Sequence, residues 1–287
     1  MPLDMTRGLH WIGHPASLGW IVDRGEESVE PQIDVRQGTS MGGGIRVRES
    51  RTRPSRAWSF TIPDSHADEV AHVESLIYGA LGPYQLVTSR AQVSNALTPD
   101  RSLLRSTIAG SVSRGGGWPK EDGAWTTFSG ANPSAGGGAI GLVRVGPCPI
   151  PPIRTARPVT VSAWLGTARA AGARVILEWL DAAGSLLSGG ISGNLVTGMD
   201  VLRRSTATGT PPWGAVSCRI AVQYAEVLAQ PQITWTAAPI PEWSVGQGAD
   251  RVTITGWSAA TSMSVPDDYN LRRSDHTLTL IEPGPTQ

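Results

Sequence analysis

The chain has 287 residues, enough for two domains of ordinary size that each bury a core. Lysine plus arginine and aspartate plus glutamate number 24 each, which argues against a protein that binds nucleic acid or an anionic membrane through its overall charge. The 34 glycines and 22 prolines are spread along the chain, which favours short strands joined by turns. No apolar run approaches the roughly 18 residues that cross a bilayer, and the N-terminus lacks a leader pattern, so we expect a soluble protein made in the cytoplasm.

The first 57 residues predict short strands and a hairpin with a basic rim. Alternation at 32–36 breaks at a run of three glycines and resumes at 45–48, where arginines begin to recur: Arg46, Arg48, Arg51, Arg53 and Arg56. Such a cluster can bind phosphates. However, no aromatic residue is interleaved before Trp58, and Glu49 interrupts the run. We therefore expect solvated strand faces or salt bridges to a neighbouring subunit, and no specific nucleic acid.

Residues 58–99 predict a strand, a helix, a second strand and the start of another domain. Residues 58–62 alternate large apolar with small polar side chains, and Pro63 is expected to end that strand. Ser65 can cap a helix with one apolar stripe, which Gly79 is expected to end in a left-handed conformation. A second strand is expected up to residue 87, and Asn95 opens a compositionally different segment.

From Asn95 to about residue 239 the sequence predicts antiparallel strands. Alternation recurs at 159–164, 175–179, 216–222 and 232–236, and the turn at 181–184 places Gly184 where a positive φ is needed. Short strands with glycine and proline between them favour a sandwich or jelly roll. Three tryptophans within strand patterns are expected in the core: Trp164, Trp179 and Trp235.

Cys148 and Cys218 are the two cysteines of the chain, too few for a metal site or a disulfide framework. Cys218 shares an alternating face with Ile220 and Val222, which predicts a small buried apolar side chain. A disulfide between the two cysteines remains an alternative, which requires that the fold places them side by side and that oxidation follows.

The last segment predicts two strands, at 251–257 and 276–281, joined by a polar loop that contains Pro266. Two strands do not form a stable domain, so they must join an existing sheet. The sequence therefore predicts a mainly β protein with two parts. Residues 1–95 and 245–287 are expected to form a split β-sandwich domain with one α-helix, and residues 96–240 an inserted antiparallel jelly-roll sandwich.

Three segments resemble a family of phage proteins: "R.WSFTIPD....EVAHVESLIYG.LGPYQLV" at 56–87, "SNALTPDRSLL" at 94–104 and "TLTLIEPG" at 277–284. They are similar to the distal tail proteins, minor tail proteins that cap the tail tube of long-tailed bacteriophages of high-GC hosts. The resemblance implies a structural virion protein at the tail tip, forming a homo-oligomeric, hexameric ring. The implied partners are the tail tube protein, the tape measure protein and the tail-tip or baseplate hub protein.

The middle segment resembles carbohydrate-binding modules of the jelly-roll type, or galectin-like domains, through "PVTVSAWL", "ARVILEWLDAAGSLL", "PPWGAVSCRIAV" and "QITWT". In such modules sugar rings stack on exposed aromatic side chains while polar groups bind the hydroxyls. The resemblance implies a candidate glycan platform in Gly- and Pro-rich loops: Trp118, Trp125, Asp122 and Trp213. An adhesin that engages host cell-wall polysaccharide is the alternative function, and packing or subunit contact is the preferred explanation of these tryptophans.

Motifs of enzymes are incomplete in this chain. A GxSxG pattern at 38–42 lacks the helix that a nucleophile elbow needs, and a GxGxxG pattern at 136–141 lacks the preceding strand of a dinucleotide site. His66 and His72 are six residues apart, which does not put two metal ligands on one helix face. Glu178 with Asp181 is a weak match to a glycosidase pair. We expect no enzymatic activity, no cofactor and no metal.

Overall fold

The computed structural model describes residues 9–14, 17–22, 28–32, 35–39, 45–49, 55–65, 67–79, 82–105, 117–126, 143–187, 189–265 and 268–283. The chain divides into two compact units, unit 1 with residues 1–86 and 249–287, and unit 2 with residues 87–248. The fold is mainly β, built of several antiparallel sheets that do not close into a barrel within the described residues, which confirms the predicted fold class.

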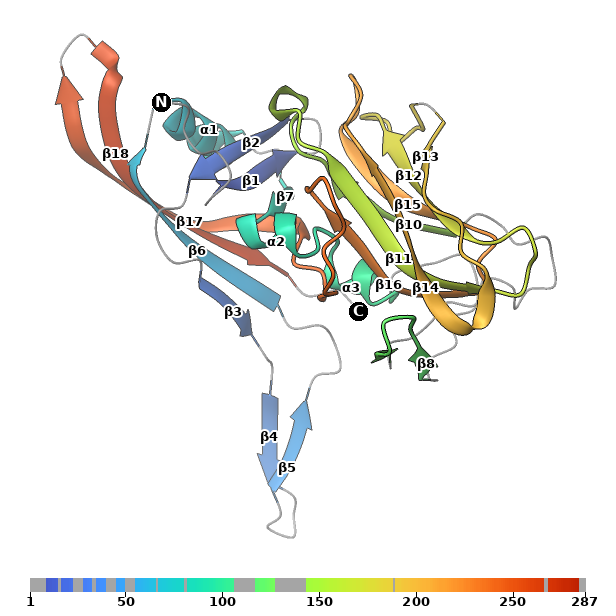
Figure 1. The fold of residues 1–287 in the computed structure, drawn as a ribbon. Coiled ribbons are helices and arrows are strands. Elements are labelled where there is room, and N and C mark those ends of the chain that lie inside the picture. The colour runs from blue at the N-terminus through green and yellow to red at the C-terminus, as the bar shows by residue number, and fades with distance from the viewer. Residues whose placement is uncertain are drawn as a thin grey trace. The chain divides into compact units, whose positions relative to one another are not determined.

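Unit 1 contains a sheet to which both ends of its chain contribute. Its seven strands lie in the order β2-β1-β7-β17-β18-β6-β3. Their bounds are β1 Leu9–His14, β2 Ser17–Val22, β3 Ser28–Gln32, β6 Ser55–Ser65, β7 Tyr84–Val87, β17 Ala249–Val265 and β18 Asp268–Glu282, while β4 (Val35–Thr39) and β5 (Ile45–Glu49) pair as a separate hairpin. Because β17 and β18 lie between β7 and β6, the C-terminal strands complete the middle of a sheet begun by the N-terminal part (Figure 1).

Helix α1 (Ala67–Tyr78) covers one face of this sheet through its apolar stripe. Val73 and Leu76 pack in one core with Phe60 and Leu278, and the hydroxyl of Tyr84 at the start of β7 donates a hydrogen bond to the carbonyl of Leu76. The same core holds further buried side chains, namely Ile12, Trp58, Ile62, Leu86, Ala249, Val252 and Leu280. The helix is therefore fixed to the sheet by packing and by one buried hydrogen bond.

Two residues expected to end elements act differently from the prediction. Gly79 does not adopt a positive φ. Its amide donates to the carbonyl of Ser75 at 2.9 Å, and a Cβ at this position would lie 2.3 Å from that oxygen, so the close approach requires glycine. Pro63 does not end its strand, because β6 continues to Ser65 with a register shift against β18 after Ile62. Such an irregularity accommodates a residue without an N–H group.

The predicted loop between the last two strands is largely strand. β17 and β18 pair from Thr253 opposite Ile281 out to Val265 opposite Asp268, with three register shifts on the way (Figure 1). In a two-stranded ribbon each strand satisfies the backbone groups of the other, so no apolar face is needed to continue the pairing. The polar composition of this stretch therefore misled the prediction.

Unit 2 is a sandwich of a four-stranded sheet, β10-β15-β12-β13, and a three-stranded sheet, β14-β11-β16. The strands are β10 Val143–Pro149, β11 Val159–Thr167, β12 Arg174–Leu180, β13 Ile191–Ser192, β14 Gly198–Gly209, β15 Ser217–Gln223 and β16 Val227–Thr234. Apart from the short β13, consecutive strands alternate between the two sheets, as in a jelly roll. A hydrogen bond joins the two sheets directly. The Val175 amide of β12 donates to the Ser205 hydroxyl of β14 at 3.0 Å.

Short elements precede or accompany the sandwich. Helices α2 (Ser89–Val93) and α3 (Pro99–Ser102) and a 3-10 turn (Ile153–Thr155) were not predicted, and β8 (Trp118–Pro119) pairs with β9 (Trp125–Thr126) in a small hairpin. The turn at Gly184 has the predicted positive φ, at 77°. Trp164, Trp179 and Trp235 are all buried, which confirms the prediction for these tryptophans.

The two chain ends of unit 2 are joined at Asn95, where the sequence placed the start of the module. The side-chain amide of Asn95 donates to the carbonyls of Pro231 at 3.1 Å and Ser244 at 3.0 Å, and its oxygen accepts from the amides of Ile233 at 3.2 Å and Leu97 at 3.3 Å. Asn95 is fully buried. One side chain therefore connects the entry segment, strand β16 and the exit segment.

Buried His10 should make the stability of unit 1 sensitive to pH. The imidazole lies in β1 with its ring centroid 4.7 Å from that of Phe60, and burial lowers the pKa of His10 from 6.5 to about 4. Between pH 6.5 and pH 4 the unfolded chain binds a proton at His10 that the folded unit does not bind. The stability of unit 1 therefore falls as the pH drops from about 6.5 towards 4. Between pH 7.5 and pH 5 we expect His10 to account for a loss of about 2 kcal/mol.

This pH dependence is measured by hydrogen exchange of the amides of β1 and β6 at the two pH values. His10→Gln removes the titrating ring, so the variant should lose less stability than the wild type over the same interval. Equal losses in the two proteins would contradict the assignment.

Candidate functional site

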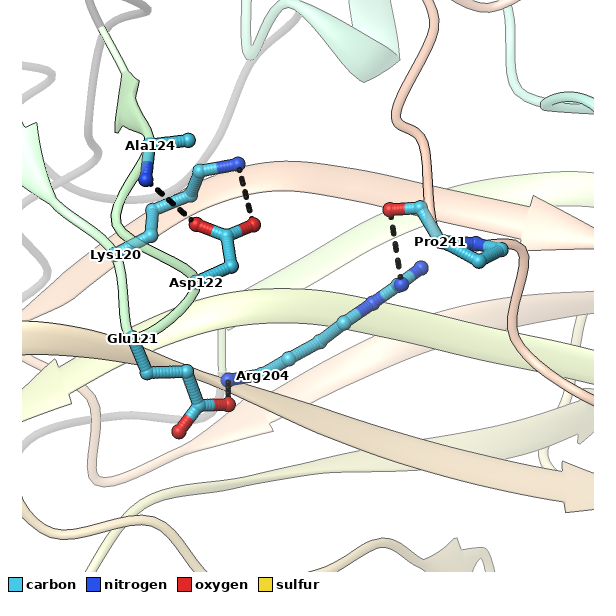
Figure 2. A network of polar contacts seen from close by, with 6 residues as sticks. All are labelled: Lys120, Glu121, Asp122, Ala124, Arg204 and Pro241. Carbon is cyan, nitrogen blue, oxygen red and sulfur yellow. Dashed lines mark hydrogen bonds and ion pairs between the residues drawn. The ribbon is translucent and has the colours of Figure 1, made fainter.

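The β8–β9 hairpin carries three of the predicted glycan-platform residues. Its turn is closed by the amide of Lys120, which donates to the carbonyl of Ala124 at 2.9 Å. The Asp122 carboxylate accepts from the Ala124 amide at 2.9 Å and lies 3.3 Å from the Lys120 ammonium (Figure 2). The hydrogen bond from Ala124 and the neighbouring Lys120 hold the pKa of Asp122 below its usual value. The Asp122 carboxylate therefore stabilises its own turn.

The hairpin is fastened to strand β14. The Glu121 amide donates to the carbonyl of Leu202 at 2.9 Å, and the Glu121 carboxylate accepts from the Arg204 amide at 3.3 Å and lies 3.3 Å from the Arg203 guanidinium. The Lys120 ammonium lies 4.6 Å from the ring centroid of Trp164 on β11, a cation–π contact. The hairpin thus covers the face of the three-stranded sheet that points away from the four-stranded sheet, here called the outer face.

The two tryptophans of the hairpin have different environments. Trp118 is half-buried and packs against the cluster of Trp164, Leu202, Val227 and Ala229 on the outer face. The side chain of Trp125 is 68% exposed, with its ring edge against Gly117, where a Cβ would lie 3.0 Å away. Trp118 therefore stabilises the attachment of the hairpin, and Trp125 presents a ring to solvent.

A polar network that the sequence did not predict fills the rest of the outer face. The Arg204 guanidinium donates to Ser162 at 2.9 Å and to Gln232 at 2.7 Å. It also donates to the carbonyl of Pro241 at 3.3 Å (Figure 2). Gln232 in turn donates to the carbonyl of Glu242 at 3.1 Å. Burial lowers the pKa of Arg204. The segment 236–244 is thereby held over β11 and β16.

These contacts bury a row of polar side chains on the outer face. Thr160, Ser162, Gln232 and Thr234 are each at most 2% exposed. A sugar ring could reach this part of the outer face after displacement of the hairpin or of segment 236–244. In the folded unit 2 this surface is a filled internal contact, and it is not an open platform.

Trp213 is the most exposed of the predicted platform residues, at 90%. It occupies a turn in which the Ala215 amide donates to the Pro212 carbonyl at 3.2 Å and Gly214 has a φ of 86°, as in a type II turn. A Cβ on Gly214 would lie 3.8 Å from a methyl group of Leu187, which is itself exposed. Trp213 and Leu187 are therefore two exposed apolar side chains at or beside the same turn of unit 2.

The five arginines proposed for a subunit interface differ in what the structure describes. Arg46 and Arg48 belong to β5, their side chains lie outside the described residues, and Arg51 and Arg53 lie outside them altogether. Arg56 is buried, with guanidinium nitrogens 2.8 and 2.7 Å from the Glu282 carboxylate and its Cζ 4.9 Å from the Trp58 ring centroid. The charge of Arg56 is thus neutralised inside unit 1.

The weak glycosidase pair is engaged in structural contacts. The Glu178 carboxylate accepts from Arg219 of the neighbouring strand β15 at 2.5 Å and from Arg144 of β10, the strand beyond it, at 3.2 Å. Asp181 accepts from the amides of Ala183 and Ser185 at 2.9 and 2.8 Å and so closes a turn. Among the described residues, no three histidine, cysteine or acidic side chains gather as metal ligands. Helices in the described part of the chain are too short or too polar to span a membrane.

Comparison with known proteins adds little to this picture. No protein-family model matches the chain, and no curated protein matches it. Among solved structures, the chain is similar to the arabinosyltransferase EmbB from Mycobacterium smegmatis, with 16% sequence identity and a TM-score of 0.27. The match covers 51% of this chain and 18% of the arabinosyltransferase chain, so this chain spans a small part of that protein's length. A TM-score this low assigns neither a fold nor an activity.

Proposed function

We propose that this chain is a structural virion protein of a long-tailed bacteriophage, forming a ring at the distal end of the tail tube. The ring would join the tube and the tape measure protein to the tip or baseplate hub protein. The sequence resemblance at 56–104 and 277–284 supports this role. Unit 2 is then a structural module carried by the ring subunit, and its buried outer face agrees with a packing role.

The observation that carries the proposal is the edge of the unit 1 sheet. In the described part of the chain, β2 and β3 end the seven-stranded sheet. Strand β3 contains Glu30 and Pro31, which discourage the addition of another strand. Strand β2 has the sequence SLGWIV, with neither charge nor proline. An apolar edge strand without such protection suits pairing with a second copy, and a closed ring removes the edges of every subunit.

The ring is tested by native mass measurement of the full chain, for which we expect a closed homo-oligomer, six copies by the resemblance. Leu18→Lys places a charge on β2 opposite Gly13, which has no side chain to displace, and should shift the protein towards monomer. Ser28→Lys, on β3 opposite Ser59, is the matched control and should assemble like the wild type. A strict monomer in solution, together with absence of an antibody label at the tail tip of particles, would refute the proposal.

The alternative is an adhesin that binds cell-wall glycan, and the exposure of Trp213 favours it. A turn that holds an indole in solvent suits stacking on a sugar ring. On this alternative Trp213 is the preferred platform candidate, with Trp125 second, because these two tryptophans are the most exposed of the candidates.

For the adhesin, Trp213→Ala should abolish binding of host wall polysaccharide, because a single anchor aromatic carries much of a weak affinity. Its melting temperature should stay within about 1 °C of the wild type, since surface changes cost little. Trp118→Ala is the contrasting variant, expected to lower the melting temperature by loosening the hairpin. Glycan binding that survives Trp213→Ala, or that is absent from the wild type, argues for the structural role alone.

A further inference from the structure

The two cysteines, far apart in sequence, are direct partners in the four-stranded sheet of unit 2. Cys148 of β10 lies opposite Cys218 of β15 in the antiparallel ladder, next to a register shift that follows Val145. Directly opposite residues point to the same face, with Cα atoms about 4.5 or 5.5 Å apart. Disulfides join Cα atoms roughly 4.4–6.8 Å apart, so the backbone already has the spacing that a bridge needs.

Both sulfur atoms are buried thiols in this structure. Cys148 donates a hydrogen bond of 3.3 Å to the carbonyl of Ala96 in the entry segment, close to the Asn95 junction. Cys218 lies between Cys148 and Trp179 of β12 in the sheet. Burial raises the pKa of the Cys218 thiol, which keeps it protonated at neutral pH. The pair is therefore shielded from bulky reagents but within reach of each other.

We propose that Cys148 and Cys218 form an oxidation site, a dithiol that a hydroperoxide converts into a cross-strand disulfide stapling β10 to β15. The bridge would close a loop of roughly 70 residues, which restricts the unfolded chain strongly. Strands β11, β12 and β14 all lie within that loop, so the staple would hold most of the sandwich.

The chemistry balances with one molecule of hydrogen peroxide. The sulfur of Cys148 attacks a peroxide oxygen, which gives a sulfenic acid and releases water. The sulfur of Cys218 then attacks the sulfenic sulfur, the S–S bond forms, and a second water leaves with the Cys218 proton. Two electrons pass from the two sulfurs to the peroxide.

The timing of this step rests on the proposed function, whereas the chemistry does not. A dithiol is kept reduced in the cytoplasm and persists as a disulfide in oxidising surroundings. In a virion protein, the staple would form after release from the cell, when unit 2 must last without resynthesis.

The test treats the full-length protein with hydrogen peroxide and maps its peptides without reduction. We expect a linked pair of peptides containing Cys148 and Cys218, two hydrogens lighter than the separate peptides. Thiols titrated after denaturation should fall from two to none, and the melting temperature of unit 2 should rise by roughly 5–10 °C and return on reduction. Cys218→Ala should instead give a sulfenic acid at Cys148, which dimedone traps when it is present as the treated protein is unfolded, with no such rise.

Three results would overturn the proposal. Two titratable thiols could remain after a treatment that fully oxidises the unfolded chain, the bridges could join separate chains, or the bridged protein could melt below the reduced one. Peptide mapping needs neither a ring nor a virion, so failure of the proposed function and failure of the staple are separate outcomes.

Discussion

Replacing Asn95 with alanine should lower the free energy of unfolding of unit 2 by about 3–5 kcal/mol. The change leaves the carbonyls of Pro231 and Ser244 without this donor, and the amides of Ile233 and Leu97 without this acceptor. A buried polar group that loses its partner costs roughly 1–3 kcal/mol, and the small cavity adds to the loss.

Asn194 offers a matched control for this variant. Its side chain also makes paired contacts, donating to the Arg204 carbonyl at 3.0 Å and accepting from the Thr206 amide at 2.7 Å, but it is exposed to water. Asn194→Ala should therefore cost about 1 kcal/mol. Hydrogen exchange of β16 amides measures both losses, while amides of β6 and β18 report on unit 1. Equal losses in the two variants, or a loss confined to unit 1, would contradict the role given to Asn95.

Strands with an apolar alternation could be predicted from the sequence, and the strand without one could not. β11, β12 and β15 carry buried apolar residues at every second position, and their predicted positions agree with the structure to within a few residues. For β16 the prediction of 232–236 met only the end of the strand, which begins at Val227 and ends at Thr234. The 12-residue strand β14 was missed because its sequence, GMDVLRRSTATG, is mostly polar. Its pairing with β11 and the hairpin above it supply the burial that its own composition does not indicate.

The surroundings of the candidate site could not be predicted, for a related reason. Alternation indicates which face of a strand is polar, but it does not indicate what covers that face. Thr160 and Ser162 alternate with apolar residues along β11, and segment 236–244 and Arg204 bury them with hydrogen bonds. The covering segments have little regular structure, so periodicity contains no signal for them. The Gly-rich surroundings of Trp118 likewise indicated exposure, and the tertiary contact with Trp164 decided otherwise.

Arg56 shows that the tertiary partner of a charged residue is also not indicated by the local sequence. By position it belonged to a run of arginines, and the run favoured a shared role at a subunit interface. Its ion-pair partner Glu282 lies 226 residues later in the chain, and the register of β6 with β18 places the two side chains opposite each other. The local sequence does not indicate that ion pair. It forms because the C-terminal strand β18 pairs with β6 in the sheet of unit 1.

Replacing Arg56 with alanine should therefore destabilise unit 1 by about 3–5 kcal/mol, the usual cost of removing one partner of a buried ion pair. The side chains of Arg56 and Glu282 are 11% and 3% exposed, so little water is available to solvate the remaining carboxylate. The contact of the guanidinium with the Trp58 ring is lost as well. Hydrogen exchange of the β6 and β18 amides should show the loss.

The double variant Arg56→Met with Glu282→Leu separates an internal role from an interface role. It removes both charges and keeps apolar volume against Trp58, so it should recover most of the stability lost in Arg56→Ala, because a well-packed apolar pair often replaces a buried ion pair without net cost. It should also assemble to the same mass as the wild type, since the ion pair points into unit 1. If Arg56→Ala instead kept wild-type stability but failed to assemble, the result would support a role for Arg56 in the subunit interface.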